Sequence, residues 1–245
     1  MSSVNNFIDK LNKLKSEEIV SVKLPSSQKE IKLNPLSVKQ QKNLLRLTMD
    51  GPAGVANTLK EINNIIFDNV IDKDVDISSI DKYAILLELR KKSLGSSITI
   101  DDKKYNLNDI AKPEKPSPGV FSATVKYSNI EVKLELPDLS KENKFLSKVA
   151  HEIKKVKEDQ GKETITTMYL YEVIKVIKTI SFDGTEISFS ELTNDECKQI
   201  VENFPVSLNQ KILNYVKVTK DYENSIITFS DGAVVPIHTL FLTGE

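Results

Sequence analysis

The alternation of apolar and polar positions is most informative over residues 80–110. Apolar side chains occupy two faces of a helical period over residues 80–89, which predicts a helix that is buried on most of its sides. Residues 98–107 then alternate apolar and polar around Asp101 and Asp102, which is the period of a half-buried strand pair with a polar turn. The segment is therefore expected to be a core helix followed by a β-hairpin.

Three consecutive basic residues, called the basic step below, lie between this predicted helix and the hairpin. Arg90, Lys91 and Lys92 fall in the last helical turn, where cations complement the negative end of the helix dipole. Gly95 follows at the position of a left-handed cap. The three cations are interpreted mainly as a helix terminus, and they are also kept as candidate interface residues.

A second helical pattern occupies the start of the chain. Phe7, Ile8 and Leu11 recur at helical spacing among lysine and asparagine, which predicts a short amphipathic arm over residues 1–18. A helix this short needs another surface to order it. We expect the arm to dock on a partner, which makes these three side chains candidate interface residues.

Between the arm and the core helix, the spacing of apolar residues changes from every second residue, as in a strand, to that of a helix. Residues 20–33 alternate around a turn that begins at Pro25, which predicts a hairpin. Ser37 is placed to cap a following helix, and a second helix is expected over residues 55–70.

A proline-rich stretch, residues 111–119, contains three of the nine prolines and no large apolar residue, which is typical of a stiff linker. After it the order of strand, turn, strand and helix starts again, which indicates a weak internal duplication. The expected organisation is an N-terminal arm at 1–18, an α+β domain at 19–112, a linker at 113–119 and a second α+β domain at 120–245.

The second half is expected to mirror the first. A hairpin at 123–136 precedes a helix, and a nearly all-apolar helix at 168–180 precedes a strand pair around Asp183 and Gly184. The remaining predicted elements are helices at 191–204 and 207–218 and a closing strand pair around Asp231 and Gly232. The expected fold class is α+β, with two similar halves in which helices support small antiparallel β-hairpins.

Composition narrows the class of protein. The chain has 245 residues, of which 39% are hydrophobic and 28% charged, as in an ordinary soluble globular protein rather than a disordered or fibrous one. Its formal net charge of -1 gives no global field that would attract nucleic acid or anionic lipid. No stretch approaches the ~20 apolar residues of a membrane span, and no signal peptide is expected. Its single cysteine excludes an internal disulfide and fits synthesis in a reducing compartment.

Few residues offer chemistry. The eight glycines form neither of the common phosphate-binding motifs, and His151 and His238 have no acid or nucleophile at a diagnostic spacing. Cys197 lies at helical spacing from apolar residues, which favours a packed core thiol over a nucleophile. Three aspartates have the spacing of a calcium loop but lack its glycine and its closing glutamate: Asp72, Asp74 and Asp76. We expect no catalytic residue, no metal and no cofactor, and hence no enzyme.

Two segments carry a family pattern. In the first, a strand pair leads into a helix start, and in the second a helix ends in basic residues and glycine before a strand. The residues that carry it are Pro35, Leu36, Val38, Leu44 and Leu45 in the first segment and Leu89, Arg90, Lys92, Ser93 and Gly95 in the second. Both resemble the baseplate proteins of T-even-like contractile-tailed bacteriophages, in the family of the hub protein. The second half of the chain is similar only in outline.

The resemblance implies a structural component of the central baseplate or hub of a phage tail. Such a protein would bind other baseplate, hub and tail proteins of the same phage, in several copies per baseplate, and would be made in the host cytoplasm. Hairpin edges that pair with neighbouring subunits are compatible with that role.

Two alternatives stay open at this stage. A hub assembly chaperone would have the same fold but leave the finished particle. A nucleic-acid-binding or host-interacting regulator would need a basic face with stacking aromatic residues, which a chain with 7% aromatic residues and no tryptophan offers poorly. Neither membrane nor nucleic acid is an expected partner.

Overall fold

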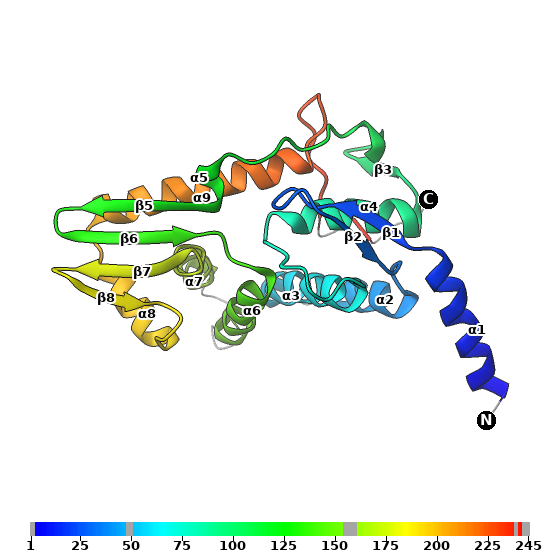
Figure 1. Cartoon of the computed structure of the whole chain (residues 1–245), viewed down its shortest axis with the longest axis horizontal. Coiled ribbons are helices and arrows are strands. Elements are labelled where there is room, and N and C mark those ends of the chain that lie inside the picture. The colour runs from blue at the N-terminus through cyan, green and yellow to red at the C-terminus, as the bar shows by residue number, and fades with distance from the viewer. Residues whose placement is uncertain (1–2, 48–50, 154–160, 238–239, 242–245) are drawn as a thin grey trace.

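A computed structural model describes residues 3–47, 51–153, 161–237 and 240–241 (Figure 1). Helices and small antiparallel sheets make up the described part of the chain, which confirms the α+β class. The elements of the first half are α1 (Ser3–Glu17), β1 (Val20–Lys23), β2 (Glu30–Leu33), α2 (Val38–Leu47), α3 (Gly51–Asn69), α4 (Asp81–Leu94), β3 (Ser97–Ile100), β4 (Lys103–Asn106) and the 3-10 turn η1 (Leu107–Asp109).

The second half repeats the order of hairpin, helices and hairpin, but here the two hairpins join. Its strands form one antiparallel sheet in the order β5-β6-β7-β8, whereas β1-β2 and β3-β4 stay separate pairs. The elements are α5 (Pro118–Phe121), β5 (Ser122–Tyr127), β6 (Ile130–Glu135), α6 (Leu139–Ile153), α7 (Gly161–Ile174), β7 (Ile177–Phe182), β8 (Thr185–Ser188), α8 (Asn194–Glu202) and α9 (Val206–Ile226).

Helix α4 is the core element that the sequence predicts. Ile85, Leu86 and Leu89 are fully buried, and each contributes about 1.5–3 kcal/mol by leaving water. The helix ends where the Gly95 N–H donates to the Lys91 carbonyl at 3.1 Å, with Gly95 at a φ of 86° that a side chain would strain.

The turn between β1 and β2 is fixed on the start of α4 by a buried carboxylate. Asp81 Oδ1 accepts from the Ser26 N–H at 2.8 Å, and its Oδ2 accepts from the Ser26 hydroxyl at 2.6 Å. Oδ2 also accepts from the Ser78 N–H at 2.9 Å. The first hairpin is therefore positioned against α4 by polar contacts as well as by packing.

The hairpin turns follow the predicted chemistry. Asp101 and Asp102 both have positive φ, 48° and 63°, and the same holds for Asp183 and Gly184, at 48° and 83°. Positive φ at both central residues is the geometry of the two-residue turn that matches the twist of the flanking strands.

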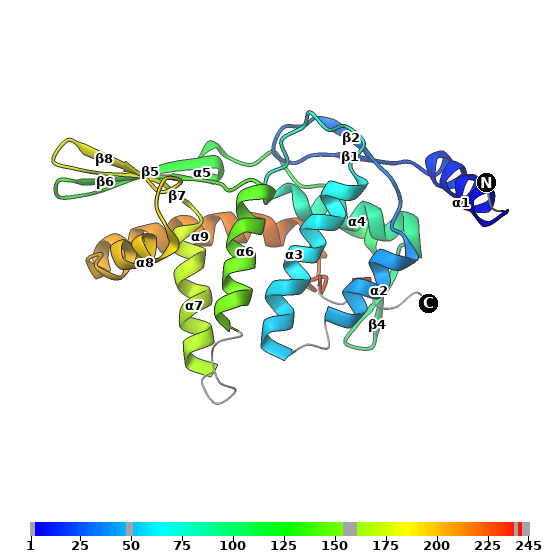
Figure 2. The ribbon, with the colours of Figure 1, turned by 90° about the horizontal axis from the view of Figure 1, so that it is seen from below.

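Two main cores and a small third one hold the molecule together. The first core combines the first half with side chains from residues 226–237 and 240–241, and the second lies between the four-stranded sheet and α7 to α9. Ala56, Val149 and Tyr171 belong to the third, which joins α3, α6 and α7 where they lie side by side (Figure 2). The predicted division at residues 113–119 stays a prediction, and the first core contains residues from both sides of it.

Two predicted elements are wrong. The helix expected over 168–180 ends with α7 at Ile174, because the following apolar residues enter the sheet as β7 and bury Ile177 and Ile180 there. The closing strand pair is shorter than expected: α9 continues to Ile226, and the pair consists of the bridge between Thr228 and Val234 with the hydrogen bonds Phe229 N–H to Ala233 C=O and Val235 N–H to Ile227 C=O. Residues 238–239 of the predicted second strand lie outside the described residues.

Candidate interaction surface

The apolar stripe of α1 is the clearest unpartnered surface among the described residues. Val4, Phe7, Ile8 and Leu11 follow the i, i+3, i+4, i+7 spacing of one helix face, and their exposed fractions are 62%, 63%, 47% and 45%. Figures 1 and 2 both show α1 extending away from the body of the molecule. The predicted arm is thus a helix whose apolar face meets solvent.

The basic step of α4 is divided between interior and surface. Arg90 is only 2% exposed, and its guanidinium donates to the carbonyls of Gly95 at 2.6 Å and Ser97 at 3.0 Å. Burial lowers the pKa of Arg90. Lys91 pairs with Glu88 at 2.7 Å, whereas Lys92 is exposed.

The structure therefore does not bring the six candidate interface residues together. Phe7, Ile8 and Leu11 share one face of the arm, and the basic step lies in the body (Figure 1). Arg90 joins the end of α4 to the first strand of the next hairpin, so its contacts are structural. The interface assignment stays a prediction, and the arm offers the exposed apolar surface for it.

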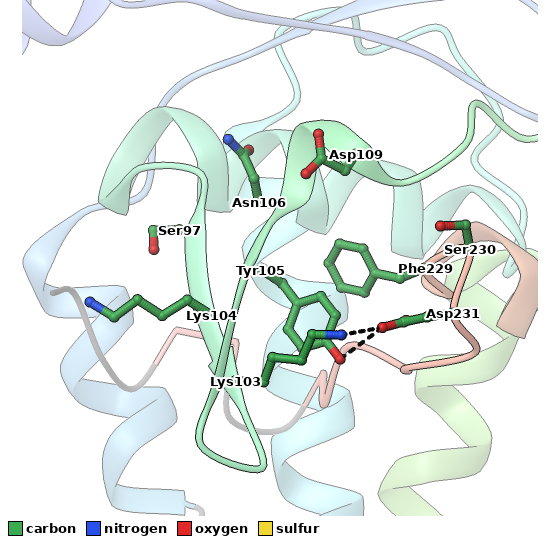
Figure 3. A pocket seen from close by; sticks show the side chains of 9 residues that line it. All are labelled: Ser97, Lys103, Lys104, Tyr105, Asn106, Asp109, Phe229, Ser230 and Asp231. Atoms are coloured by element: carbon green, nitrogen blue, oxygen red, sulfur yellow. Dashed lines mark hydrogen bonds and ion pairs between the residues drawn. The ribbon is translucent and has the colours of Figure 1, made fainter.

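A hollow of about 490 Å³ opens between the β3-β4 hairpin and residues 229–231 (Figure 3). Figure 3 shows Lys103 and Tyr105 converging on Asp231, whose Oδ2 lies 2.6 Å from the Lys103 Nζ and accepts from the Tyr105 hydroxyl at 3.1 Å. The Tyr105 ring packs on Phe229 with centroids 4.6 Å apart. The hydrogen bond from Lys103 holds the pKa of Asp231 below its usual range. These polar groups bond to one another, so the contacts hold the β3-β4 hairpin against residues 229–231.

A network of half-buried and buried charges on α4, α6, α7 and α9 is absent from the sequence prediction. Lys82 of α4 is 3% exposed, and its Nζ lies 2.8 Å from Oε2 of Glu142 on α6. The same oxygen accepts from the Asn63 amide of α3 at 3.0 Å. Burial would lower the pKa of Lys82, but the charge of Glu142 reverses this and raises it.

The network continues through α7 to α9. Glu172 lies 2.9 Å from both Lys175 and Lys220. Burial raises the pKa of Glu172, but the two lysines overcome this and bring it to about 2. Burial also raises the pKa of Glu223 to about 7, against the opposing charges of Lys175 and Lys82. In the sequence, Lys82 and Glu172 stand out as charges within largely apolar stretches, whereas Glu142 and Lys220 lie in helices that carry many charges.

The residues singled out for chemistry lie apart. Cys197 is buried, burial raises the pKa of its thiol, and its Sγ donates weakly to the Phe189 carbonyl at 3.8 Å. His151 is exposed near the end of α6, and His238 lies outside the described residues. Over the described ranges, no group of three His, Cys, Asp or Glu side chains is placed to hold a metal ion.

In the same part of the chain, no helix combines the length and the apolar character that a bilayer span requires.

The comparisons with known proteins give one result. A protein-family model described as "T4 bacteriophage base plate protein" matches residues 16–226, which is most of the chain. No curated protein and no solved structure matches the chain. The matched range begins at the end of α1, so the apolar stripe lies outside it.

Proposed function

Because the chain belongs to the T4 bacteriophage base plate protein family, we propose that it is a structural component of the central baseplate or hub of a contractile phage tail. The family membership confirms the resemblance drawn from residues 22–45 and 80–101. A baseplate family implies a location in the virion tail and interactions with other tail proteins, and it suggests a non-enzymatic role. The hub position, the contractile tail and synthesis in the host cytoplasm are part of the proposal.

The observation that carries partner binding is the exposed stripe of α1. Its four apolar side chains are roughly half exposed, so covering them would contribute about 1 kcal/mol each, before the cost of association. A helix of this length gains most of its stability from tertiary packing of its apolar face. A neighbouring baseplate protein that covers this face would supply the packing that the arm lacks within its own chain.

The test is the protein composition of purified phage particles, measured by mass spectrometry. We expect the chain in the particle, and we expect the double variant Phe7→Asp/Leu11→Asp to be depleted, because charges on the stripe oppose its burial. Asn6→Asp is the matched control, since Asn6 is exposed on the opposite face of α1. Absence of the unmodified chain from particles would overturn the structural role and favour the assembly chaperone. Normal incorporation of the double variant would remove the arm from the proposal.

A further inference from the structure

A groove of about 500 Å³ lies beside the first hairpin. It is lined by Ser21, Val22 and Lys23 of β1, by one face of α4, and by the segment 107–113 that leads into the proline-rich crossing. Such a volume is within the range of sites that hold a small ligand or a short peptide segment. The groove is separate from the arm and from the hollow of Figure 3.

The edge of β1 that faces away from β2 is unpaired. The Leu24 N–H donates to the Lys29 carbonyl at 2.8 Å, so the backbone of Leu24 points toward β2. Backbone groups alternate in direction along an antiparallel pair, so Val22 also points toward β2, and Ser21 and Lys23 point the other way. Among the described residues, no backbone partner is recorded for the N–H and C=O groups of Ser21 and Lys23 on that side.

The outer edge of β2 shows the contrast. The Lys32 N–H donates to Asp72 Oδ2 at 2.7 Å, and the Lys32 carbonyl accepts from the Ile71 N–H at 2.9 Å. One edge of the hairpin is thus covered by the chain itself, and the other faces the groove. An open strand edge is a template for a further strand.

The charged side chains that line the groove have a positive sum. Lys23 and Lys112 are exposed and have no recorded ion pair within the described residues, whereas Lys91 is balanced by Glu88. The lining therefore carries an excess of two positive charges. This excess favours a partner segment with acidic side chains.

We infer that the groove binds an extended, acidic segment of a neighbouring baseplate protein, which adds as a strand to the free edge of β1. This inference rests on the proposed function for the identity of the neighbour. The occupant is extended rather than helical, because a helix satisfies its own backbone groups and would leave those of Ser21 and Lys23 unpaired. Specificity comes from Lys23 and Lys112, which meet carboxylates on the added strand.

The binding test uses two fluorescein-labelled octapeptides, one of alternating valine and glutamate and one of alternating valine and lysine, added to the full chain. We expect the acidic peptide to bind at least tenfold more tightly by fluorescence anisotropy. Hydrogen exchange followed by NMR should show the Ser21 and Lys23 amides becoming protected when it binds. Failure of the acidic peptide to bind, equal affinity for both peptides, or binding without protection of these amides would overturn the inference.

Two variants separate charge from backbone pairing. Lys23→Glu/Lys112→Glu should weaken binding of the acidic peptide at least tenfold. Lys217→Glu, at an exposed position on α9, should leave the affinity for this peptide unchanged. Ser21→Pro removes the outward N–H without breaking a hydrogen bond to β2, so it should weaken peptide binding, whereas Ser21→Ala should not. Circular dichroism checks that each variant folds. Unchanged affinity in the folded charge variant contradicts the inference.

The same charge variant distinguishes this inference from the proposed function. If particles incorporate it as well as the unmodified chain, the groove is not the baseplate contact, and the structural role stands without it. If the unmodified chain is missing from particles, the proposed function fails, and the peptide result then decides whether the groove binds acidic strands.

Discussion

Removing the cation of the buried pair between α4 and α6 should destabilise the protein strongly. In Lys82→Met the carboxylate of Glu142 stays buried, loses the ammonium 2.8 Å from its Oε2, and keeps the hydrogen bond from the Asn63 amide at 3.0 Å. Lys175 remains as a cation that acts on this carboxylate. Removing one partner of a buried ion pair typically costs about 3–5 kcal/mol, because the other charge is left uncompensated. We expect a loss of that size in the free energy of unfolding.

The double variant Lys82→Met/Glu142→Met gives the sharper test. Replacing both charges by apolar side chains removes the uncompensated charge, and such replacements are often close to neutral. The double variant should therefore be more stable than either single variant. The coupling energy between the two positions should be at least about 2 kcal/mol, within the range seen for contacting residues.

Urea unfolding followed by circular dichroism measures these differences through the midpoint at a constant slope. Lys217→Met, at an exposed position of α9, is the control and should change the free energy of unfolding by less than about 0.5 kcal/mol. The reasoning is refuted if Lys82→Met costs less than about 1 kcal/mol. It is equally refuted if the losses of the two single variants add up in the double variant.

Three further predictions concern stability. Burial raises the pKa of the Glu223 carboxyl from 4.5 to about 7. The protonated carboxyl therefore contributes its full share to the free energy of unfolding below pH 4.5. This contribution, at most about 3 kcal/mol, is lost as the pH rises through 7. Glu223→Gln should therefore raise the melting temperature at pH 8 and change it little at pH 4.5, whereas Glu202→Gln on the surface does neither. Arg90→Met should cost about 3 kcal/mol in urea unfolding, because two carbonyls lose a charged donor. Asp102→Gly should stabilise the protein by up to about 1 kcal/mol, because glycine adopts the φ of 63° without strain.

Each of these has an outcome that contradicts it. Equal effects of Glu223→Gln at both pH values would show that the carboxyl does not titrate near neutrality. Full stability of Arg90→Met would mean that water replaces the guanidinium at both carbonyls. A lower melting temperature for Asp102→Gly would indicate that the aspartate side chain stabilises the turn more than its backbone conformation costs.

Local patterns predicted the first half well. Helix α4 follows from apolar residues on two faces, and the β3-β4 turn follows from Asp101 and Asp102 between alternating strands. The limit of α7 was missed because the apolar run continues into β7 with no glycine or proline to mark the change. Periodicity cannot separate a buried helix from a buried strand over a few apolar residues.

The candidate interface was predicted only in part, because exposure depends on tertiary packing. The stripe of α1 was readable as a helix face, since its spacing is local. Arg90 was read as a terminal cation, and its burial against the Gly95 and Ser97 carbonyls depends on how the next hairpin folds back. In the charge network around Lys82, Lys82 and Glu142 are 60 residues apart in the sequence, so nothing in the local pattern connects them.

Residues 226–237 and 240–241 complete the first core, and this bears on the order of events during translation. Domains that are contiguous in sequence fold as they leave the ribosome, N-terminal part first. Here Leu24 and Ile85 pack in one core with Phe229, Val235 and Phe241, which are synthesised more than a hundred residues later. The first half therefore cannot complete its core until the end of the chain has been made. In a nascent chain stalled before residue 226, part of the first core would be exposed to solvent. Its fate would depend on what shields that surface until translation resumes.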